Sequence, residues 1–394
     1  MYRKFSADQL FNGYEILPAE KVLITDAAGK VLDIVNLADA GDGIQHFNGL
    51  LSPGFINCHC HIELSHMKAL IPPHTGLVEF VQKVMTQRNA SLEEKAQAMQ
   101  DAEMEMYNNG IVAVGDICNT ADSISLKQKS KLHWQNFVEV SGFVDAVADK
   151  RFAAAKEIVE TFKSQLPNCK TTISPHAPYS VSKTLFQLLN DATANELITI
   201  HNQESVEEDK LYQNKTGNFL NLYKNFGIDI SSFTPTQKSS LQSWFPYFTN
   251  NQSMLLVHDT FTNNEDLALL KLSTINYQLS TSFCLCPNAN LYIENELPAI
   301  EMFLANNIHI VMGTDSLASN HSLNVLEELK TLQHHFPSLS ITTLLQFATS
   351  NGARALQMDE ELGAFEKGKK PGLVLIEKVE DGKFGSSTVS RRIF

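Results

Sequence analysis

The chain has 394 residues, of which 43% are hydrophobic and 19% are charged, a composition typical of a globular protein with a large core. Its 31 Lys and Arg residues and 44 Asp and Glu residues give a net charge of −13, which argues against binding to nucleic acid or to an anionic membrane. The sequence contains no apolar run of the roughly 20 residues that span a bilayer and no N-terminal signal segment, so we expect a cytoplasmic protein with reduced cysteines.

Both ends of the chain favour β-strands. Residues 21–25 and 31–35 are apolar runs that flank a turn-rich segment, and residues 372–376 form a third run. Short strands at opposite ends cannot each build a domain, whereas chain termini often lie close together. We therefore predict one small β-sandwich-like domain built from residues 1–50 and 365–394.

The central body, residues 51–364, alternates short apolar runs with longer segments of helical periodicity. Within one such segment, Ser91 followed by Glu94 matches the capping box that begins a helix. Eight strands alternating with helices predict an α/β fold of the (β/α)₈ TIM barrel type. A doubly wound sheet is the alternative, but its G-x-G-x-x-G signature does not follow the first run. The expected strands are 55–58, 111–115, 134–140, 171–174, 197–200, 254–257, 278–284 and 308–313.

Residues that can bind a metal follow several of these runs. His59 and His61 end the first, and in a strand two residues at this spacing project from the same face. A His-x-His pair is not improbable by chance in a chain with 13 histidines, so the metal interpretation needs further ligands elsewhere in the sequence. His201, His258 and Asp315 follow the fifth, sixth and eighth runs. Because barrel enzymes carry their chemistry at the carboxyl ends of the strands, this joint placement indicates an active site.

Imidazole and carboxylate are ligands that suit a divalent metal. We predict one metal ion, zinc with iron as the alternative, bound by a ligand cluster of His59, His61, His201 and Asp315. A bound metal lowers the pKa of water from 15.7 to about 7 and so generates hydroxide near neutral pH. The fourth strand offers no lysine at its carboxyl end to bridge a second ion, since Lys170 lies at its start.

Three residues are candidates for catalysis. Glu204, three residues beyond His201, is placed to move a proton between water and substrate. His258 is placed to orient the nucleophile or to stabilise developing charge. Asp315 is expected both to bind the metal and to accept the proton of the water.

The segments that carry these residues resemble the amidohydrolase superfamily, and within it the mononuclear aminohydrolase branch. That branch includes deaminases of guanine, S-adenosylhomocysteine, 5′-methylthioadenosine and aminodeoxyfutalosine, together with triazine hydrolases. The resemblance covers nearly the whole chain, because the family also has a small sheet domain built from both termini. Its motifs here are Pro53-Gly54-Phe55-Ile56-Asn57-x-His59-x-His61, Ser174-Pro175-His176-Ala177-Pro178-Tyr179-Ser180, His201-x-x-Glu204-Ser205, Val257-His258, Cys286-Pro287-x-x-Asn290 and Gly313-Thr314-Asp315-Ser316.

The resemblance implies the same ligand cluster and the same three catalytic residues. It also implies substrate contacts for His176 after the fourth strand, and for Glu63 and His66 in the loop after the first. Arg151 is the arginine best placed to meet a substrate carboxylate, and the role of the long connection 205–253 stays open.

Together these features predict a metal-dependent hydrolase that uses a metal-bound hydroxide to deaminate an amino-substituted heterocycle, a purine or a nucleoside-like molecule, and releases ammonia. The partner is a small molecule, and a homodimer is the assembly that the family implies. The same site would also suit a cyclic amidohydrolase or a triazine-type chlorohydrolase. A barrel that only binds a ligand or partner is a third hypothesis, but it would be expected to have lost metal ligands, and all four are present.

Overall fold

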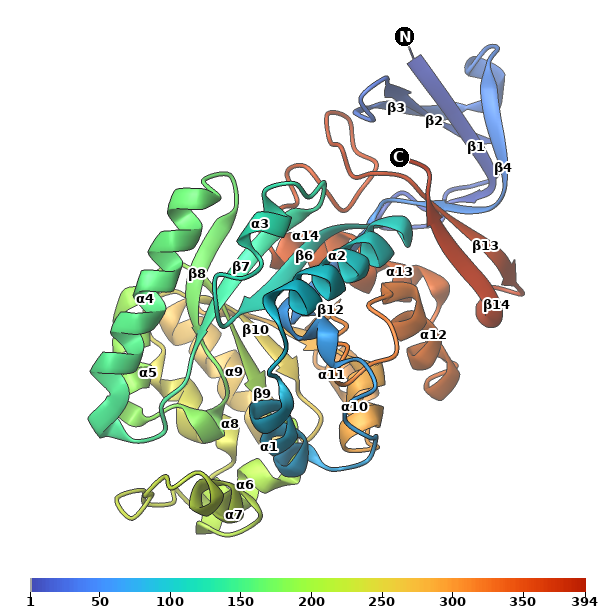
Figure 1. Ribbon diagram of the computed structural model, residues 1–394. Coiled ribbons are helices and arrows are strands. Elements are labelled where there is room, and N and C mark those ends of the chain that lie inside the picture. The colour runs from blue at the N-terminus through green and yellow to red at the C-terminus, as the bar shows by residue number, and fades with distance from the viewer. Residues whose placement is uncertain (1) are drawn as a thin grey trace.

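The computed structural model describes residues 2–394 and places a barrel beside a separate sheet that contains both chain ends (Figure 1). All eight expected strands are present, and they form two parallel sheets of four, β5-β6-β7-β8 and β9-β10-β11-β12. The strands are β5 (Phe55–Cys60), β6 (Ile111–Cys118), β7 (His133–Val140), β8 (Lys170–Pro175), β9 (Leu197–Asn202), β10 (Ser253–His258), β11 (Ser280–Leu285) and β12 (His309–Met312).

Two seams close these sheets into the predicted barrel. At the β8–β9 seam, the Thr172 hydroxyl donates to the carbonyl oxygen of Leu197 at 2.8 Å. At the β12–β5 seam, Cys60 forms a bridge with Asp315, and the backbone N–H groups of Thr314 and Asp315 donate to the His59 carbonyl oxygen at 3.0 and 3.1 Å. The second seam therefore brings the end of the first barrel strand beside the loop that follows the last one.

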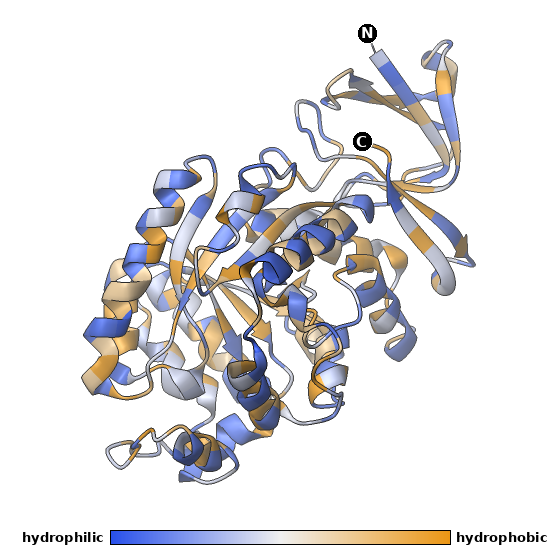
Figure 2. Cartoon of the chain, in the orientation of Figure 1, coloured by the Kyte–Doolittle hydropathy of each residue, from blue (hydrophilic) through white to orange (hydrophobic). Residues whose placement is uncertain are grey.

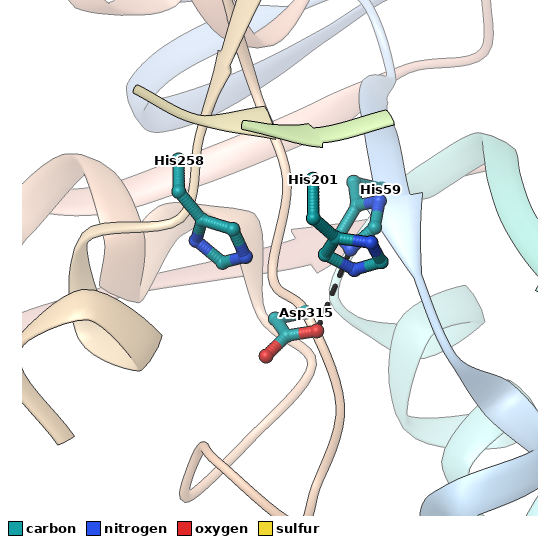
Figure 3. A group of neighbouring side chains, drawn as sticks. All are labelled: His59, His201, His258 and Asp315. Carbon is teal, nitrogen blue, oxygen red and sulfur yellow. Dashed lines mark ion pairs between the residues drawn. The ribbon is translucent and has the colours of Figure 1, made fainter. Parts of the chain in front are cut away.

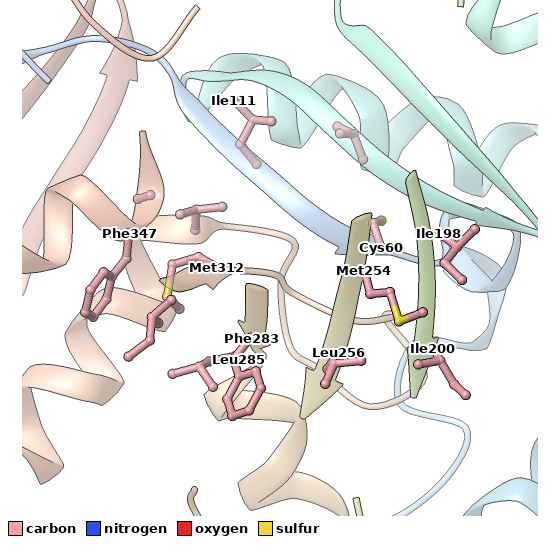
Figure 4. Packing of buried hydrophobic residues seen from close by; sticks show 14 of the residues in the cluster. Cys60, Ile111, Ile198, Ile200, Met254, Leu256, Phe283, Leu285, Met312 and Phe347 are labelled. Atoms are coloured by element: carbon pink, nitrogen blue, oxygen red, sulfur yellow. The ribbon is translucent and has the colours of Figure 1, made fainter. Parts of the chain in front are cut away.

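The strands are buried on both faces, as parallel strands covered by helices must be. In β10, Met254 and Leu256 pack in the large cluster between the strands and the surrounding helices (Figure 4). Their neighbours Leu255 and Val257 belong to a second cluster formed mainly by strand residues. Figure 2 shows the same division along the chain, with apolar residues concentrated in the central strands and polar stretches on the outer helices.

The helices follow the strands as the periodicity predicts. The expected capping box is formed, since the backbone N–H of Ser91 donates to Glu94 and that of Glu94 to the Ser91 hydroxyl. Gln278 was expected in a strand, but it ends α9 in the left-handed region, with φ 55°. The helices are α1 (Leu77–Gln87), α2 (Leu92–Asn108), α3 (Ile124–Lys127), α4 (Ala148–Gln165), α5 (Lys183–Ala192), α6 (Val206–Asn214), α7 (Phe219–Asn225), α8 (Ser240–Trp244), α9 (Asn264–Tyr277), α10 (Pro287–Ile293), α11 (Ile300–Ala305), α12 (Val325–His335), α13 (Ile341–Ala348) and α14 (Ser350–Ala355).

The separate sheet has six strands in the order β14-β13-β4-β1-β2-β3. Strand β13 pairs antiparallel with β4, so the two ends of the chain share one sheet. The domain boundaries at residues 50 and 365 stay a prediction. The strands are β1 (Tyr2–Leu10), β2 (Lys21–Asp26), β3 (Val31–Asn36), β4 (Ile44–Ser52), β13 (Val374–Glu380) and β14 (Lys383–Arg392).

Strand β4 leads almost directly into β5, the strand that carries the His-x-His pair. The turn between them is held where the backbone N–H of Gly54 donates to the Pro371 carbonyl oxygen at 2.9 Å. The sheet built from both termini therefore anchors the start of β5. Across residues 2–394, the helices lack the combination of length and apolar character that crossing a membrane requires.

Candidate active site

The ligand cluster predicted from the sequence lies at the carboxyl ends of the barrel strands. Figure 3 shows three of its members, His59, His201 and Asp315, together with His258, and possible ligand atoms of these four side chains lie within 4.8 Å of one another. Nε2 of His61 lies 3.1 Å from Nε2 of His59 and 3.1 Å from Nε2 of His201. Oδ1 of Asp315 lies 3.3 Å from Nε2 of His61 and 3.5 Å from Nε2 of His59. The structure thus brings together His59 from β5, His61 directly after it, His201 from β9 and Asp315 from the loop after β12.

The spacing of these four atoms fits a metal ion. Ligand atoms about 2.0–2.1 Å from a tetrahedral zinc are about 3.3–3.4 Å from one another. Four of the six separations among these atoms are known, and their range of 3.1–3.5 Å brackets that value. Nδ1 of His201 is 2.9 Å from the His176 carbonyl oxygen, to which it must donate, so the lone pair of Nε2 faces the cluster.

The protonation states of the cluster also suit a cation. Burial lowers the pKa of His59 and of His201 to about 4, so both rings are neutral near neutral pH. Burial opposes the charge of Asp315, but its contact with His59 and the charges of His61 and His258 outweigh burial and hold the pKa of Asp315 well below its ordinary range. Neutral imidazoles beside an ionised carboxylate are the forms that bind a metal.

His258 lies beside the cluster and is held from behind. Its Nδ1 is 2.8 Å from Oδ1 of Asn290, so Nδ1 carries the proton and Nε2 has the free lone pair. This buried Nε2 has no hydrogen-bond partner among the described residues and lies 3.6 Å from Oε1 of Glu204. The ring therefore offers a polar atom to whatever occupies the space between the cluster and Glu204.

Two of these residues have strained backbones. His258 and Asp315 have φ angles of 77° and 56°, in the left-handed region that residues other than glycine rarely adopt. Such conformations cost on the order of 1–3 kcal/mol each and tend to occur at functional sites. At Asp315, the strained turn directs the carboxylate toward His59 and His61.

Glu204 is the buried carboxyl of the site. Burial, reinforced by the negative charge of Asp315, raises its pKa well above the ordinary value. Its backbone N–H donates to Oε1 of Glu208 at 2.9 Å, which fixes the loop that carries it. Burial therefore favours the protonated form of Glu204, which can donate a proton.

A cavity of about 770 Å³ opens onto these groups. Its polar side consists of strand-end residues, and most of the remaining wall comes from α1, α4, α7 and the loop after β7. The polar side includes His61, His176, His201, Glu204, His258 and Asp315. We call the other side the apolar wall, and it includes Phe80, Val84, Phe143, Ile158, Leu222 and Phe226.

The predicted substrate contacts are only partly brought to this cavity. His176 lines it, and Arg151 does too, whereas Glu63 and His66 are absent from the described residues around it. Glu63 instead accepts hydrogen bonds from the backbone N–H of Asn119 and from the Thr120 hydroxyl, both at 3.1 Å. Nε2 of His66 lies 2.9 Å from the Arg88 carbonyl oxygen. The structure therefore places these two side chains in supporting positions outside the cavity lining, and their contact with substrate stays a prediction.

Two site residues were not given a role by the sequence. Asn290 was part of a motif, but only the structure shows that it holds His258. Glu139, near the end of β7, lies 3.5 Å from Nδ1 of His201 and accepts a hydrogen bond from Nδ2 of Asn119 at 2.8 Å. Its signal in the sequence was an acidic residue near the end of an otherwise largely apolar run.

The long connection 205–253 folds into α6, α7 and α8 rather than an open loop. Leu222, Tyr223 and Phe226, in and beside α7, contribute to the cavity wall. The ring of Tyr223 stacks on Phe143 with centroids 4.9 Å apart. Part of this connection therefore shapes the space that a substrate would fill.

Comparisons with known proteins agree with this fold and site. A model described as the amidohydrolase family matches residues 50–392. An adenosine deaminase of Helicobacter pylori is 30% identical over 335 residues, which is 83% of this chain and 78% of the relative. A 5′-deoxyadenosine deaminase of Methanococcus vannielii is 27% identical over 353 residues, 86% of this chain and 77% of the relative.

A solved structure extends the likeness to three dimensions. The crystal structure of Helicobacter pylori aminofutalosine deaminase in complex with methylthio-coformycin superposes with a TM-score of 0.80 and 26% identity, covering 97% of this chain and 93% of that chain. These comparisons confirm the predicted barrel with its sheet from both termini. They also confirm a hydrolase that acts on non-peptide carbon–nitrogen bonds.

Proposed function

The chain belongs to the amidohydrolase family, and on that basis we propose that it deaminates a 6-aminopurine nucleoside with the help of one divalent metal. The observation that carries the proposal is the convergence of His59, His61, His201 and Asp315 beside the buried Glu204. The relatives named as adenosine and 5′-deoxyadenosine deaminases support the choice of substrate class.

We propose the four residues of the ligand cluster as the metal ligands. Zinc is favoured, because three imidazoles and a carboxylate are typical of its sites, and iron is the alternative. With these four ligands, a divalent metal held there would bind water as a fifth ligand and would lower the pKa of that water to about 7. A homodimer and a cytoplasmic location stay predictions from the sequence.

The protein groups around that position have complementary tasks. Asp315, ionised, accepts a proton from the water, and His258 directs its free Nε2 at the same space. Glu204, kept protonated by burial, gives its proton to the ring nitrogen beside the carbon that bears the amine. A carbon–oxygen bond forms at the carbon that bears the amine, and the amine then takes up the proton that Asp315 accepted. The hydroxyl proton passes back to Glu204 as the carbonyl forms, and the carbon–nitrogen bond breaks to release ammonia.

The cavity suggests where the rest of the substrate lies. With the purine ring among the strand-end residues, the apolar wall is left for the ribose and for a 5′ substituent. Phe143, supported by the stacked ring of Tyr223, presents a rigid apolar surface there. We therefore propose that a nucleoside with an apolar 5′ group is preferred over adenosine.

Ammonia release from the zinc-loaded protein tests the reaction. Adenosine, 5′-deoxyadenosine and 5′-methylthioadenosine are the first substrates, and kcat/KM should be about 10-fold higher with the methylthio group than with adenosine. Glu204→Gln should lower kcat by about 10²–10⁴-fold with unchanged zinc content. Glu196→Gln, at an exposed position, is the matched control and should keep wild-type activity.

The alternative reactions are separated by the same assay. Release of chloride from a chlorinated triazine, or opening of a cyclic amide, without ammonia release from any aminopurine would reject the proposal in favour of the other hydrolase types. Wild-type turnover by Glu204→Gln would reject the role of Glu204. Full turnover by an Asp315→Ala protein that holds no metal would reject the metal site.

A further inference from the structure

A buried ion pair lies in the barrel outside the catalytic cavity. Asp116 is on β6 and Lys127 ends α3, and Nζ of Lys127 is 2.5 Å from Oδ2 of Asp116, with both side chains 0% exposed. Lys127 also donates to Oδ1 of Asn136 at 2.8 Å and contacts Sγ of Cys118 at 3.3 Å. Buried pairs of this kind rarely stabilise a fold more than apolar residues of the same volume would. Stability alone therefore does not account for the presence of this one.

The second oxygen of Asp116 contacts the backbone next to a proposed metal ligand. Oδ1 accepts a hydrogen bond from the backbone N–H of Ile62 at 2.9 Å, in a buried position. Ile62 directly follows His61, and the peptide between them is planar. Holding its N–H fixes the orientation of the whole peptide unit, and with it the Cα atom of His61.

The pairing of β5 with β6 becomes irregular toward the end of β5. Its register with β6 runs regularly from Ile56 to Asn57 and then shifts before Cys60 pairs with Asp116, so that His59 falls within the irregular segment. β5 ends at Cys60, and His61 has φ −117° and ψ 78° at the start of a 3₁₀ helix, η2 (Ile62–Met67). The Asp116 side chain thus supplies a hydrogen bond where the backbone ladder has ended.

We propose that Asp116 and Lys127 form a positioning pair that holds His61 in the metal site through the N–H of Ile62. Lys127 fixes one carboxylate oxygen so that the other points at Ile62. This inference rests on the proposed role of His61 as a metal ligand. Among the described residues, neither Asp116 nor Lys127 lines the cavity. The pair therefore acts on the site through Ile62 and His61, and not by touching metal or substrate.

Two double variants separate the hydrogen bond from the charges. Asp116→Asn with Lys127→Met removes both charges but keeps an oxygen that can accept from Ile62. Asp116→Leu with Lys127→Met removes the charges and the acceptor together. The measurement is zinc affinity of the metal-free protein by competition with a chromophoric chelator, with folding checked by circular dichroism.

We expect the Asp116→Leu double variant to bind zinc about 10–100-fold more weakly than the Asp116→Asn double variant, the range found for partners that orient metal ligands. Equal affinities in the two would overturn the inference. If the Asp116→Leu variant does not fold, the donor is removed instead with Ile62→Pro, which suits the first position of a helical turn. Its matched control, Ile62→Val, keeps the N–H, and equal zinc affinity in these two variants would likewise overturn the inference.

Failure of this inference is distinguishable from failure of the proposed function. A wild-type protein that binds no zinc and gains no activity on reconstitution with zinc or iron would overturn both. Wild-type zinc binding that His61→Ala abolishes, together with equal affinities within each pair of variants, would overturn only the positioning role of Asp116 and Lys127.

Discussion

Replacing Lys127 by methionine should destabilise the fold severely. Methionine has nearly the length of lysine, so contact with the rings of Trp134 and Phe162, whose centroids lie 5.0 and 5.1 Å from Nζ, is largely kept. What is lost is the charge that faces Asp116 and the proton that Asn136 accepts. Removing one partner of a fully buried pair leaves an uncompensated charge, and this costs about 3–5 kcal/mol.

The same substitution at a pair with an exposed lysine provides the control. Nζ of Lys210 lies 2.6 Å from Oε1 of Glu207, almost the distance in the buried pair, but the Lys210 side chain is 51% exposed. The Glu207 side chain is 12% exposed and keeps the hydrogen bond from the backbone N–H of Asn218, and water can reach the place of the exposed ammonium, so Lys210→Met should cost about 0–1 kcal/mol. Because the two pairs have nearly the same N–O distance, the difference between the two losses in unfolding free energy reports the effect of burial.

Urea unfolding of the metal-free proteins, followed by circular dichroism, measures both costs. Lys127→Met should shift the midpoint strongly, and adding Asp116→Asn should recover much of the loss because the unpaired charge is then gone. If Lys127→Met lowers the free energy of unfolding by less than about 1 kcal/mol, as little as Lys210→Met, burial does not make the loss of one partner costly and the reasoning is refuted.

Three further predictions concern the site and its surroundings. Zinc at 100 times its dissociation constant should stabilise the wild-type fold by about 2.7 kcal/mol in urea titrations, and an equal gain in Asp315→Ala would contradict the ligand assignment. Asn290→Leu removes the acceptor 2.8 Å from Nδ1 of His258 and should lower kcat by about 10–100-fold with zinc content unchanged; loss of zinc would instead make His258 a ligand. Burial raises the pKa of Glu328 from 4.5 to about 8, so between these values the folded state holds a proton that the unfolded state has released, and stability falls as pH rises. Glu328→Gln should flatten that fall between pH 5 and pH 8 in urea titrations, and an unchanged slope would show that another group is responsible.

The barrel and the core of its site follow from local features of the sequence. Strands such as Leu197–Asn202 appear in the sequence as short apolar runs. A polar residue such as His201 or His258 marks where each run ends. In a parallel barrel all carboxyl ends lie on one side, so a residue at a strand end is placed in space without knowledge of its neighbours. This is why the positions of His59, His61, His201 and Asp315 could be anticipated from their joint placement after the apolar runs.

The direction of side chains beyond the strand ends was not available from the sequence. Glu63 and His66 lie three residues apart in η2, and a 3₁₀ helix has three residues per turn, so the two share a face. That face meets the backbone at Asn119 and at Arg88 rather than the cavity. How a short helix is rotated depends on what it packs against. η2 packs against α2 and β6, and its side chains bond to the loop after β6 and to Arg88, just beyond α1.

The sequence by itself determined the family of the chain, the order of its strands and the residues at their ends, because those depend on runs of a few neighbouring residues. Only the tertiary structure decided which partners orient the ligands. Glu139 reaches His201 from two strands away, and Asp116 reaches Ile62 because the β5–β6 register shifts at His59. These contacts join residues more than 50 positions apart, and a register shift is set by how two strands pair, which neither strand specifies alone.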